Sequence, residues 1–182
     1  MTDWKTLDSK VVYETPWIKV NKDQVKIHNG KDITYSYMSL HAPTVQIVAV
    51  DHQKRILLQQ IYRYPIKQSL WEVPCGHSDG EDLLDAAKRE LLEETGLAGD
   101  KWSSLGELKV ASGVADVTSK LFLAEDVEHI SEERDQEEAI GEQKFFTIAE
   151  IKQMIDRGEI VDAETLVGLY KYILKHDEEN DV

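Results

Sequence analysis

The stretch that decides the fold is residues 81–97, EDLLDAAKRELLEETGL, which reads as one amphipathic helix ended by Gly96. At about 100° per residue, one helix face collects the apolar side chains of Leu83, Leu84, Ala87 and Leu91. That face can pack on a sheet. Ser78 or Asp79 is a suitable residue to cap the start of the helix, so we expect the helix to run from about Glu81 to Gly96.

Two carboxylates lie beside the apolar face of this helix. Glu90 and Glu94 are one turn apart, and like charges in that relation repel by roughly 0.2–0.5 kcal/mol. A cation between them reverses this repulsion, and Mg²⁺ prefers carboxylate oxygens together with waters and substrate phosphates. Arg89 can hold Glu93 in the neighbouring row by a charge-assisted hydrogen bond. The alternative interpretation is a solvated helix face rich in Glu and Lys.

Short apolar or alternating runs on both sides of the helix predict strands and further helices. Strands are expected at residues 11–13, 18–20, 25–27, 33–40, 45–50, 55–62, 70–73, 102–111, 120–124 and 144–147. Helices are expected at residues 148–157 and 163–175, the second capped by Asp162. Strands, a helix, more strands and then helices predict a mixed sheet between helices.

Composition excludes several classes of protein. The chain has 182 residues and a net charge of −14, whereas a nucleic-acid surface needs clustered Lys and Arg. Cys75 is the single cysteine, so no intrachain disulfide can form. Residues 1–10 lack a basic-then-apolar signal pattern, and no apolar run is long enough to span a membrane. We therefore expect a cytoplasmic protein with neither a nucleic-acid nor a membrane partner.

The helix resembles the Nudix box, G-x5-E-x7-R-E-U-x-E-E-x-G-U, in which U is aliphatic. Glu81 and the run from Arg89 to Leu97 fit this pattern, but only four residues separate Gly76 from Glu81, where the family has five. Because this loop is one residue shorter, the family pattern does not determine its conformation. Residues 60–65 (QIYRYP) and 70–74 (LWEVP) resemble the segments before the box in the ADP-ribose and nucleoside-diphosphate-sugar pyrophosphatases.

The resemblance extends weakly to both ends of the chain. The N-terminal strands, with Trp4, Pro16 and Trp17, and the helix that follows Asp162 are similar to those of the same branch. It implies an α/β fold: a Nudix-type α/β/α sandwich with a mixed sheet, preceded by a small N-terminal antiparallel β subdomain. We expect that subdomain at residues 1–42, with a role in homodimerisation, and the hydrolase domain at residues 43–182.

The resemblance also implies a metal site. Residues matching Glu90 and Glu94 bind Mg²⁺ in the family, and Mn²⁺ is a possible substitute. Glu93 is a further ligand or an orienting partner. We count Glu93 and Arg89 among the candidate catalytic residues. Glu81 supports the site, and the backbone carbonyl of Cys75 completes a metal shell.

Substrate contacts are assigned by the same resemblance. Arg63 and Glu72 either contact substrate or brace one another, and a plain strand-to-strand salt bridge is the alternative. Trp17, with Tyr35 and Tyr37, is a candidate for stacking a base, although core or dimer-interface packing would also explain these aromatic residues. Ser112 stands where ADP-ribose hydrolases have proline, and lies in a candidate substrate loop.

Two acidic positions remain to be assigned. A late acidic loop supplies the general base in this branch, which points to Glu137 or Glu138, with a solvated loop as the alternative. At the start of the last helix, Glu164 stands where some nucleotide-sugar members have lysine. Ser112 departs from the pattern of the ADP-ribose hydrolases, whereas Glu164 departs from that of some nucleotide-sugar hydrolases. The two residues therefore argue against different substrates.

The expected activity is Mg²⁺-dependent hydrolysis of ADP-ribose or another nucleoside-diphosphate sugar to a nucleoside monophosphate and a sugar phosphate. A Nudix hydrolase of a dinucleotide or a nucleoside triphosphate is the first alternative. A nucleotide-sensing module without catalysis is the second. The complete set of box carboxylates disfavours the sensor.

Overall fold

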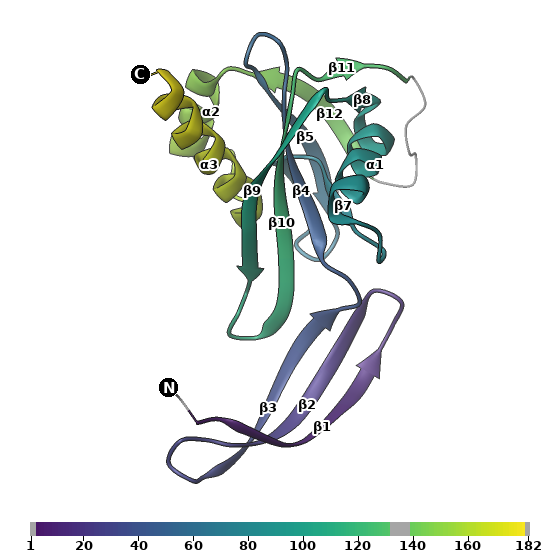
Figure 1. Cartoon of the computed structure of the whole chain (residues 1–182), viewed down its shortest axis with the longest axis vertical. Coiled ribbons are helices and arrows are strands. Elements are labelled where there is room, and N and C mark those ends of the chain that lie inside the picture. Colours follow the sequence, from purple (N-terminus) through teal and green to yellow (C-terminus); the bar gives the residue numbers. More distant parts are fainter. Residues whose placement is uncertain (1–2, 132–138, 181–182) are drawn as a thin grey trace.

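The structure is a computed structural model that describes residues 3–131 and 139–180. Its main sheet has ten strands, of which seven form the path β1-β2-β3-β10-β4-β5-β12 (Figure 1). Strands β6, β7 and β9 pair with β5, β4 and β10, and β8 and β11 form a separate two-stranded sheet. The strands are β1 Lys5–Glu14, β2 Ile18–Lys26, β3 Asp32–Leu40, β4 Thr44–Val50, β5 Ile56–Arg63, β6 Gln68–Glu72, β7 Cys75–His77, β8 Leu97–Ala98, β9 Lys101–Val110, β10 Ala115–Glu125, β11 Glu128–His129 and β12 Ile140–Phe146.

Three helices cover the two faces of the sheet. Helix α1 (Leu83–Thr95) lies on one side, and α2 (Ile148–Asp156) and α3 (Ala163–Asn180) lie on the other (Figure 1). Alternate residues of β4 point to opposite faces, so Ile47 joins the core under α1 while Val48 joins the core under α2 and α3. The predicted α/β/α sandwich with a mixed sheet is confirmed.

The first three strands form an antiparallel meander that extends away from the helices (Figure 1). Its last strand meets the rest of the sheet through a short parallel pairing with β10, where Met38 lies opposite Ala115. Every residue of β1 is exposed, so this strand lacks the burial alternation that sequence patterns detect. The prediction placed a strand only at residues 11–13 of it.

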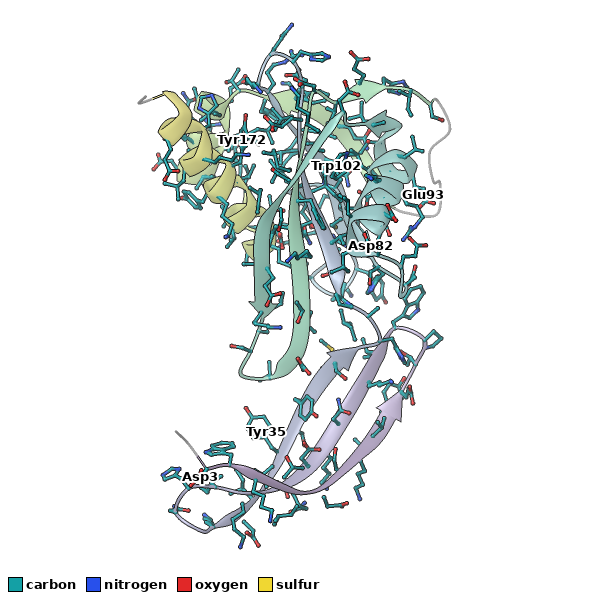
Figure 2. All side chains as sticks on the ribbon, viewed as in Figure 1. Asp3, Tyr35, Asp82, Glu93, Trp102 and Tyr172 are labelled. Atoms are coloured by element: carbon teal, nitrogen blue, oxygen red, sulfur yellow. The ribbon has the colours of Figure 1, made fainter. Side chains whose placement is uncertain are left out.

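Helix α1 begins two residues later than predicted. The cap is Asp82, whose carboxylate accepts the backbone N–H groups of Leu84 and Asp85, and not Ser78 or Asp79 (Figure 2). Glu81 therefore precedes the helix. Gly96 ends it in the left-handed conformation, as predicted.

The shortened loop before the helix is a tight turn. The Glu81 N–H donates to the Ser78 carbonyl, and Asp79 and Gly80 both adopt positive φ, 49° and 84°. This turn brings the Glu81 carboxylate 3.3 Å from Arg89 Nε despite the missing residue. Within residues 3–131 and 139–180, no helix is long and apolar enough to cross a membrane.

Candidate active site

Glu90 and Glu94 lie on the buried side of α1, with only 7% and 2% of their surface exposed. The Glu94 carboxylate accepts hydrogen bonds from Gln59 Nε2 at 2.8 Å and from the Cys75 backbone N–H at 3.1 Å. Gly76 passes so close to the Glu90 carboxylate that any side chain there would overlap it. The helix thus presents two carboxylates to the strand that carries Cys75 and Gly76.

Two glutamines, the buried Gln59 and the half-buried Gln143, support Glu94 from behind. Gln59 on β5 is fully buried, and its amide oxygen accepts a hydrogen bond from Gln143 Nε2 at 2.9 Å. The same Gln143 nitrogen donates to the backbone carbonyl of Glu94 at 2.9 Å. Because Gln59 is held by Gln143, its amide nitrogen is directed at the Glu94 carboxylate.

Arg89 joins the box carboxylates to the preceding turn. It donates to Glu93 at 2.8 Å, to Glu90 at 3.0 Å and to the His77 carbonyl at 2.9 Å. Partial burial lowers the Arg89 pKa, but the hydrogen bond to Glu93 and the charges of its other partners raise it above the ordinary value. The predicted Arg89–Glu93 pair is confirmed, and Glu93 itself points outward along α1 (Figure 2).

Arg63 and Glu72 brace one another across β5 and β6. Two hydrogen bonds of 2.9 and 2.6 Å join them, and a third runs from Arg63 to the Cys75 sulfur at 3.2 Å. The hydrogen bond to Glu72 raises the pKa of Arg63. Burial raises the pKa of the Cys75 thiol, and the nearby Glu94 carboxylate adds to that effect, so the thiol stays protonated at neutral pH.

A cleft of about 560 Å³ collects many of these groups. Its lining includes four of the predicted site residues, namely Arg63, Glu72, Cys75 and Glu94. Asp162 and Glu164 at the start of α3 line the same cleft. Four carboxylates around one guanidinium make the cleft strongly acidic.

The side of the cleft away from α1 is polar and buried. Thr44 and Gln46 from β4 line the cleft there together with Glu164. The atoms Thr44 Oγ1, Gln46 Oε1 and Glu164 Oε1 are buried without a hydrogen-bond partner among the described residues. Burial raises the pKa of Glu164, and the neighbouring Ser119 hydroxyl offsets part of that shift.

The donor set fits a divalent cation that shares its shell with substrate. No group of three His, Cys, Asp or Glu side chains among the described residues forms a ready-made metal cage. Mg²⁺ typically binds through one or two carboxylates and completes its shell with waters and phosphate oxygens. Two buried carboxylates at an acidic cleft match that mode of binding, and they do not match an all-protein cage.

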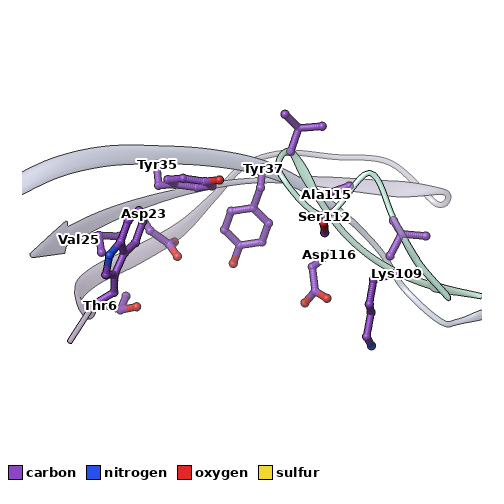
Figure 3. A pocket seen from close by; sticks show the side chains of 12 residues that line it. Thr6, Asp23, Val25, Tyr35, Tyr37, Lys109, Ser112, Ala115 and Asp116 are labelled. Atoms are coloured by element: carbon purple, nitrogen blue, oxygen red, sulfur yellow. The ribbon is translucent and has the colours of Figure 1, made fainter. Parts of the chain in front are cut away.

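Two predicted regions lie beside other pockets. Trp17 is 67% exposed, and its ring lies 6.1 Å from the ring of His77 beside a smaller pocket. Ser112 lines a separate pocket of about 450 Å³ between the N-terminal meander and the β9–β10 loop, together with Tyr35 and Tyr37 (Figure 3). Glu137 and Glu138 lie outside the described residues.

The supporting glutamines and the polar wall were not predicted. Gln59 directly follows three apolar residues of β5, and a polar residue buried there needs a partner, so its position carried a readable signal. Gln46 likewise interrupts the apolar run of β4. Gln143 carried no comparable signal, because it lies on a strand of mixed polarity.

Comparisons with known proteins agree over most of the chain. A NUDIX domain model matches residues 40–167, and a model of the nucleoside diphosphate sugar hydrolase N-terminal domain matches residues 4–38. The ADP-ribose pyrophosphatase of Mycobacterium tuberculosis is 32% identical, over 92% of this chain and 82% of its own. The ADP-ribose pyrophosphatase of Bacillus subtilis is 27% identical, over 94% and 93%.

A third relative and a solved structure complete the comparison. A methanol dehydrogenase activator of Bacillus methanolicus is 26% identical, over 91% of this chain and 90% of its own. A crystal structure described as an ADP compounds hydrolase superposes with a TM-score of 0.86 at 21% identity, covering 98% of this chain and 97% of that one. At this identity the superposition supports the fold alone.

Proposed function

The chain belongs to the Nudix hydrolase family, and from this premise we propose that it cleaves the diphosphate bond of ADP-ribose or another nucleoside-diphosphate sugar. The products are a nucleoside monophosphate and a sugar phosphate. The observation that carries the proposal is the buried Glu90–Glu94 pair on a helix that fits the family pattern, with Glu94 lining an acidic cleft. The names of two relatives, both ADP-ribose pyrophosphatases, support the substrate class.

Glu90 and Glu94 would hold a divalent cation, for which we propose Mg²⁺, with Mn²⁺ as a substitute. The backbone carbonyl of Cys75 and the outward-facing Glu93 are the further ligands we propose. Bound there, such an ion supplies Lewis-acid polarisation of the diphosphate and a more acidic water. It also offsets the negative charge of the cleft, which would otherwise repel a diphosphate.

The chain's own residues fix the geometry of this site. Gln59 and the Cys75 N–H restrict the Glu94 carboxylate to one orientation. Arg89 ties Glu90 and Glu93 to the turn that carries Glu81. Such prior ordering matters because catalysis is sensitive to displacements of about 1 Å.

Arg63 is the cation that we propose meets the substrate. It lines the cleft, its side chain is 41% exposed, and Glu72 holds its guanidinium in place. We propose Glu137 or Glu138 as the general base. We propose Trp17 and Ser112 as substrate contacts. Trp17 and Ser112 lie beside other pockets, so they would act on a substrate that extends beyond the cleft or on a partner subunit's substrate.

We also propose a homodimer formed through residues 1–42. Strand β1 is a long sheet edge with exposed apolar side chains, among them Val12 at 50% and Tyr13 at 59%. Unprotected edges of this kind readily pair with another chain. Removing residues 1–40 should give a monomer with weaker nucleotide binding, as measured by sedimentation and calorimetry. A truncated protein that is still dimeric, or a monomer with full affinity, would refute this role.

The decisive experiment is a substrate panel with Mg²⁺ and with Mn²⁺, read out by identifying the phosphate-ester products. ADP-ribose and nucleoside-diphosphate sugars should be hydrolysed faster than dinucleotides and nucleoside triphosphates. Glu94→Gln should abolish metal-dependent turnover without unfolding the protein, whereas Glu142→Gln, an exposed change of the same type on β12, should not. Undiminished activity of Glu94→Gln would disprove the assignment.

A further inference from the structure

Strand β12 forms one end of the path of paired strands in the main sheet, and β1 forms the other end (Figure 1). Among the residues that the structure describes, β12 pairs only with β5, so its outer edge carries backbone groups without a strand partner. Such an edge is a template on which another strand can pair. The contact proposed for residues 1–42 lies at the far end of the sheet and leaves this edge open.

Two charged side chains project from one face of β12. Glu142 and Lys144 are two residues apart, and both are exposed. With Phe146 they line a pocket of about 420 Å³, whose other wall includes residues of α2. Within residues 3–131 and 139–180, neither charge has an ion-pair partner, and the Lys144 ammonium lies 5.0 Å from the centre of the Phe146 ring. Both charges are therefore available to a second molecule.

The signs of these two charges make the strand complementary to itself. Charged residues often protect a sheet edge, because edges that carry like charges repel each other. Strand β12 instead presents one acid and one base. When two copies of β12 run antiparallel about a two-fold axis through Gln143, Glu142 of each copy lies opposite Lys144 of the other. Residues directly opposite have Cβ atoms about 4.5–5.5 Å apart, close enough for an ion pair.

The remaining residues of β12 suit the same register. The strand, IGEQKFF, contains no proline, so every residue can donate its backbone N–H. Gly141 of one copy lies opposite Phe145 of the other on the second face of the strand. An aromatic side chain placed across from an edge glycine covers its bare backbone, a pairing that stabilises sheets. Both faces of the strand therefore favour this alignment.

We infer that the outer edge of β12 is a self-association surface, and that its partner is β12 of a second copy of this chain. The contact has two-fold symmetry, so the same residues serve both copies. It continues the main sheet from one molecule into the next through an antiparallel pair of strands. Combined with the contact proposed for residues 1–42, it joins the chains into a tetramer or a longer assembly. The inference does not depend on the proposed hydrolysis.

Sedimentation equilibrium of the full chain tests the contact by charge reversal. Lys144→Glu places four carboxylates at the contact, two from each copy, and Glu142→Lys places four ammonium groups there. Each change should raise the dissociation constant by about tenfold or more, which corresponds to about 1.4 kcal/mol. The double variant Glu142→Lys/Lys144→Glu exchanges the charges and should return the wild-type value. Lys88→Glu, an exposed reversal on α1 with the same change in net charge as Lys144→Glu, is the matched control.

Recovery in the double variant separates pairing from damage to the strand. If the single changes only disturbed β12, combining them would not restore association. A wild type without this association, unchanged dissociation constants in the single variants, or a double variant as weak as they are would each overturn the inference. If residues 1–42 do not pair, the measurement reads a monomer–dimer equilibrium in place of a dimer–tetramer one, and the β12 contact is still tested.

A cross-linking experiment tests the register. A disulfide needs Cβ atoms about 3.5–4.5 Å apart, which favours directly opposite residues over diagonal ones at about 7–8 Å. Glu142→Cys and Lys144→Cys proteins, mixed in equal amounts with a mild oxidant, should therefore cross-link several times more than either protein alone. The wild type, with Cys75 as its single cysteine, measures the background. Equal yields from the mixture and from the separate proteins would overturn the pairing of Glu142 with Lys144.

Discussion

Replacing Gly76 by alanine should disable the proposed metal site through a single added methyl group. The new Cβ would lie 2.1 Å from Glu90 Cδ and 2.3 Å from both carboxylate oxygens, whereas ordinary contact begins at 3.4 Å. Glu90 would have to retreat by about 1.3 Å, the difference between the two contact distances. The φ of Gly76 is not in the left-handed region, so alanine introduces no backbone strain and the contact alone is tested.

The expected loss follows from the geometry of the metal. Mg²⁺ tolerates little departure from octahedral geometry, and a displacement of about 1 Å in a positioned group lowers rates by about 10²-fold. Gly76→Ala should therefore lower kcat by about 10²-fold and raise the Mg²⁺ concentration at half-maximal activity. Steady-state hydrolysis across a Mg²⁺ titration measures both quantities.

Gly113→Ala is the matched control for this prediction. A Cβ at Gly113 would meet no atom within 4 Å, so the same substitution there should leave kcat and the Mg²⁺ midpoint at wild-type values. Thermal unfolding of both variants checks that the fold persists. Wild-type kcat and an unchanged Mg²⁺ midpoint in Gly76→Ala would refute the placement of Glu90 as a ligand.

Three further variants test the surrounding structure. Gln59→Leu should lower the free energy of unfolding by about 1–3 kcal/mol in urea and weaken Mg²⁺ activation, because buried partners lose hydrogen bonds; an equal effect from Gln60→Leu would contradict this. Arg63→Gln should lower the free energy of unfolding by about 1–3 kcal/mol, because it leaves the Glu72 side chain, which is 4% exposed, without its cationic partner. This value allows for solvent screening of Arg63, which is partly exposed. Unchanged unfolding in urea would contradict this role of Arg63. The folded-state pKa of Glu164 is raised, so the wild type loses stability as the pH rises from about 4.5 through that pKa. Glu164→Gln should therefore raise Tm more at pH 8 than at pH 4, and equal shifts would contradict the desolvated carboxyl.

The sequence predicted those parts of the fold whose patterns are local. Helix α1 was found because its apolar spacing and Gly96 lie within one short segment. Its first residue was missed because Ser78, Asp79 and Asp82 are all suitable caps, and only the folded backbone selects Asp82. Only residues 11–13 of strand β1 were predicted, because an exposed strand leaves no alternating pattern.

The site divides in the same way. The Arg89–Glu93 pair spans one helical turn and was predictable from spacing. The support of Glu94 by Gln59 joins residues 35 positions apart, and that of Gln59 by Gln143 joins residues 84 apart. Gln59 and Gln143 are brought together by the pairing of β5 with β12, and Gln59 meets Glu94 only when α1 is in place beside β5. No local pattern encodes either contact. Glu164 was noticed as a departure, but its buried neighbour Gln46 was not.

The parallel pairing of β4 with β10 determines when the protein can assemble during synthesis. Residues 44–50 must wait for residues 119–125 before the centre of the sheet is complete. The meander β1–β3 can close from neighbouring residues alone, so it can form on the ribosome while β4 still lacks its partner. Through that interval the edge of β4 that will pair with β10 stays open, which exposes a largely apolar strand to aggregation.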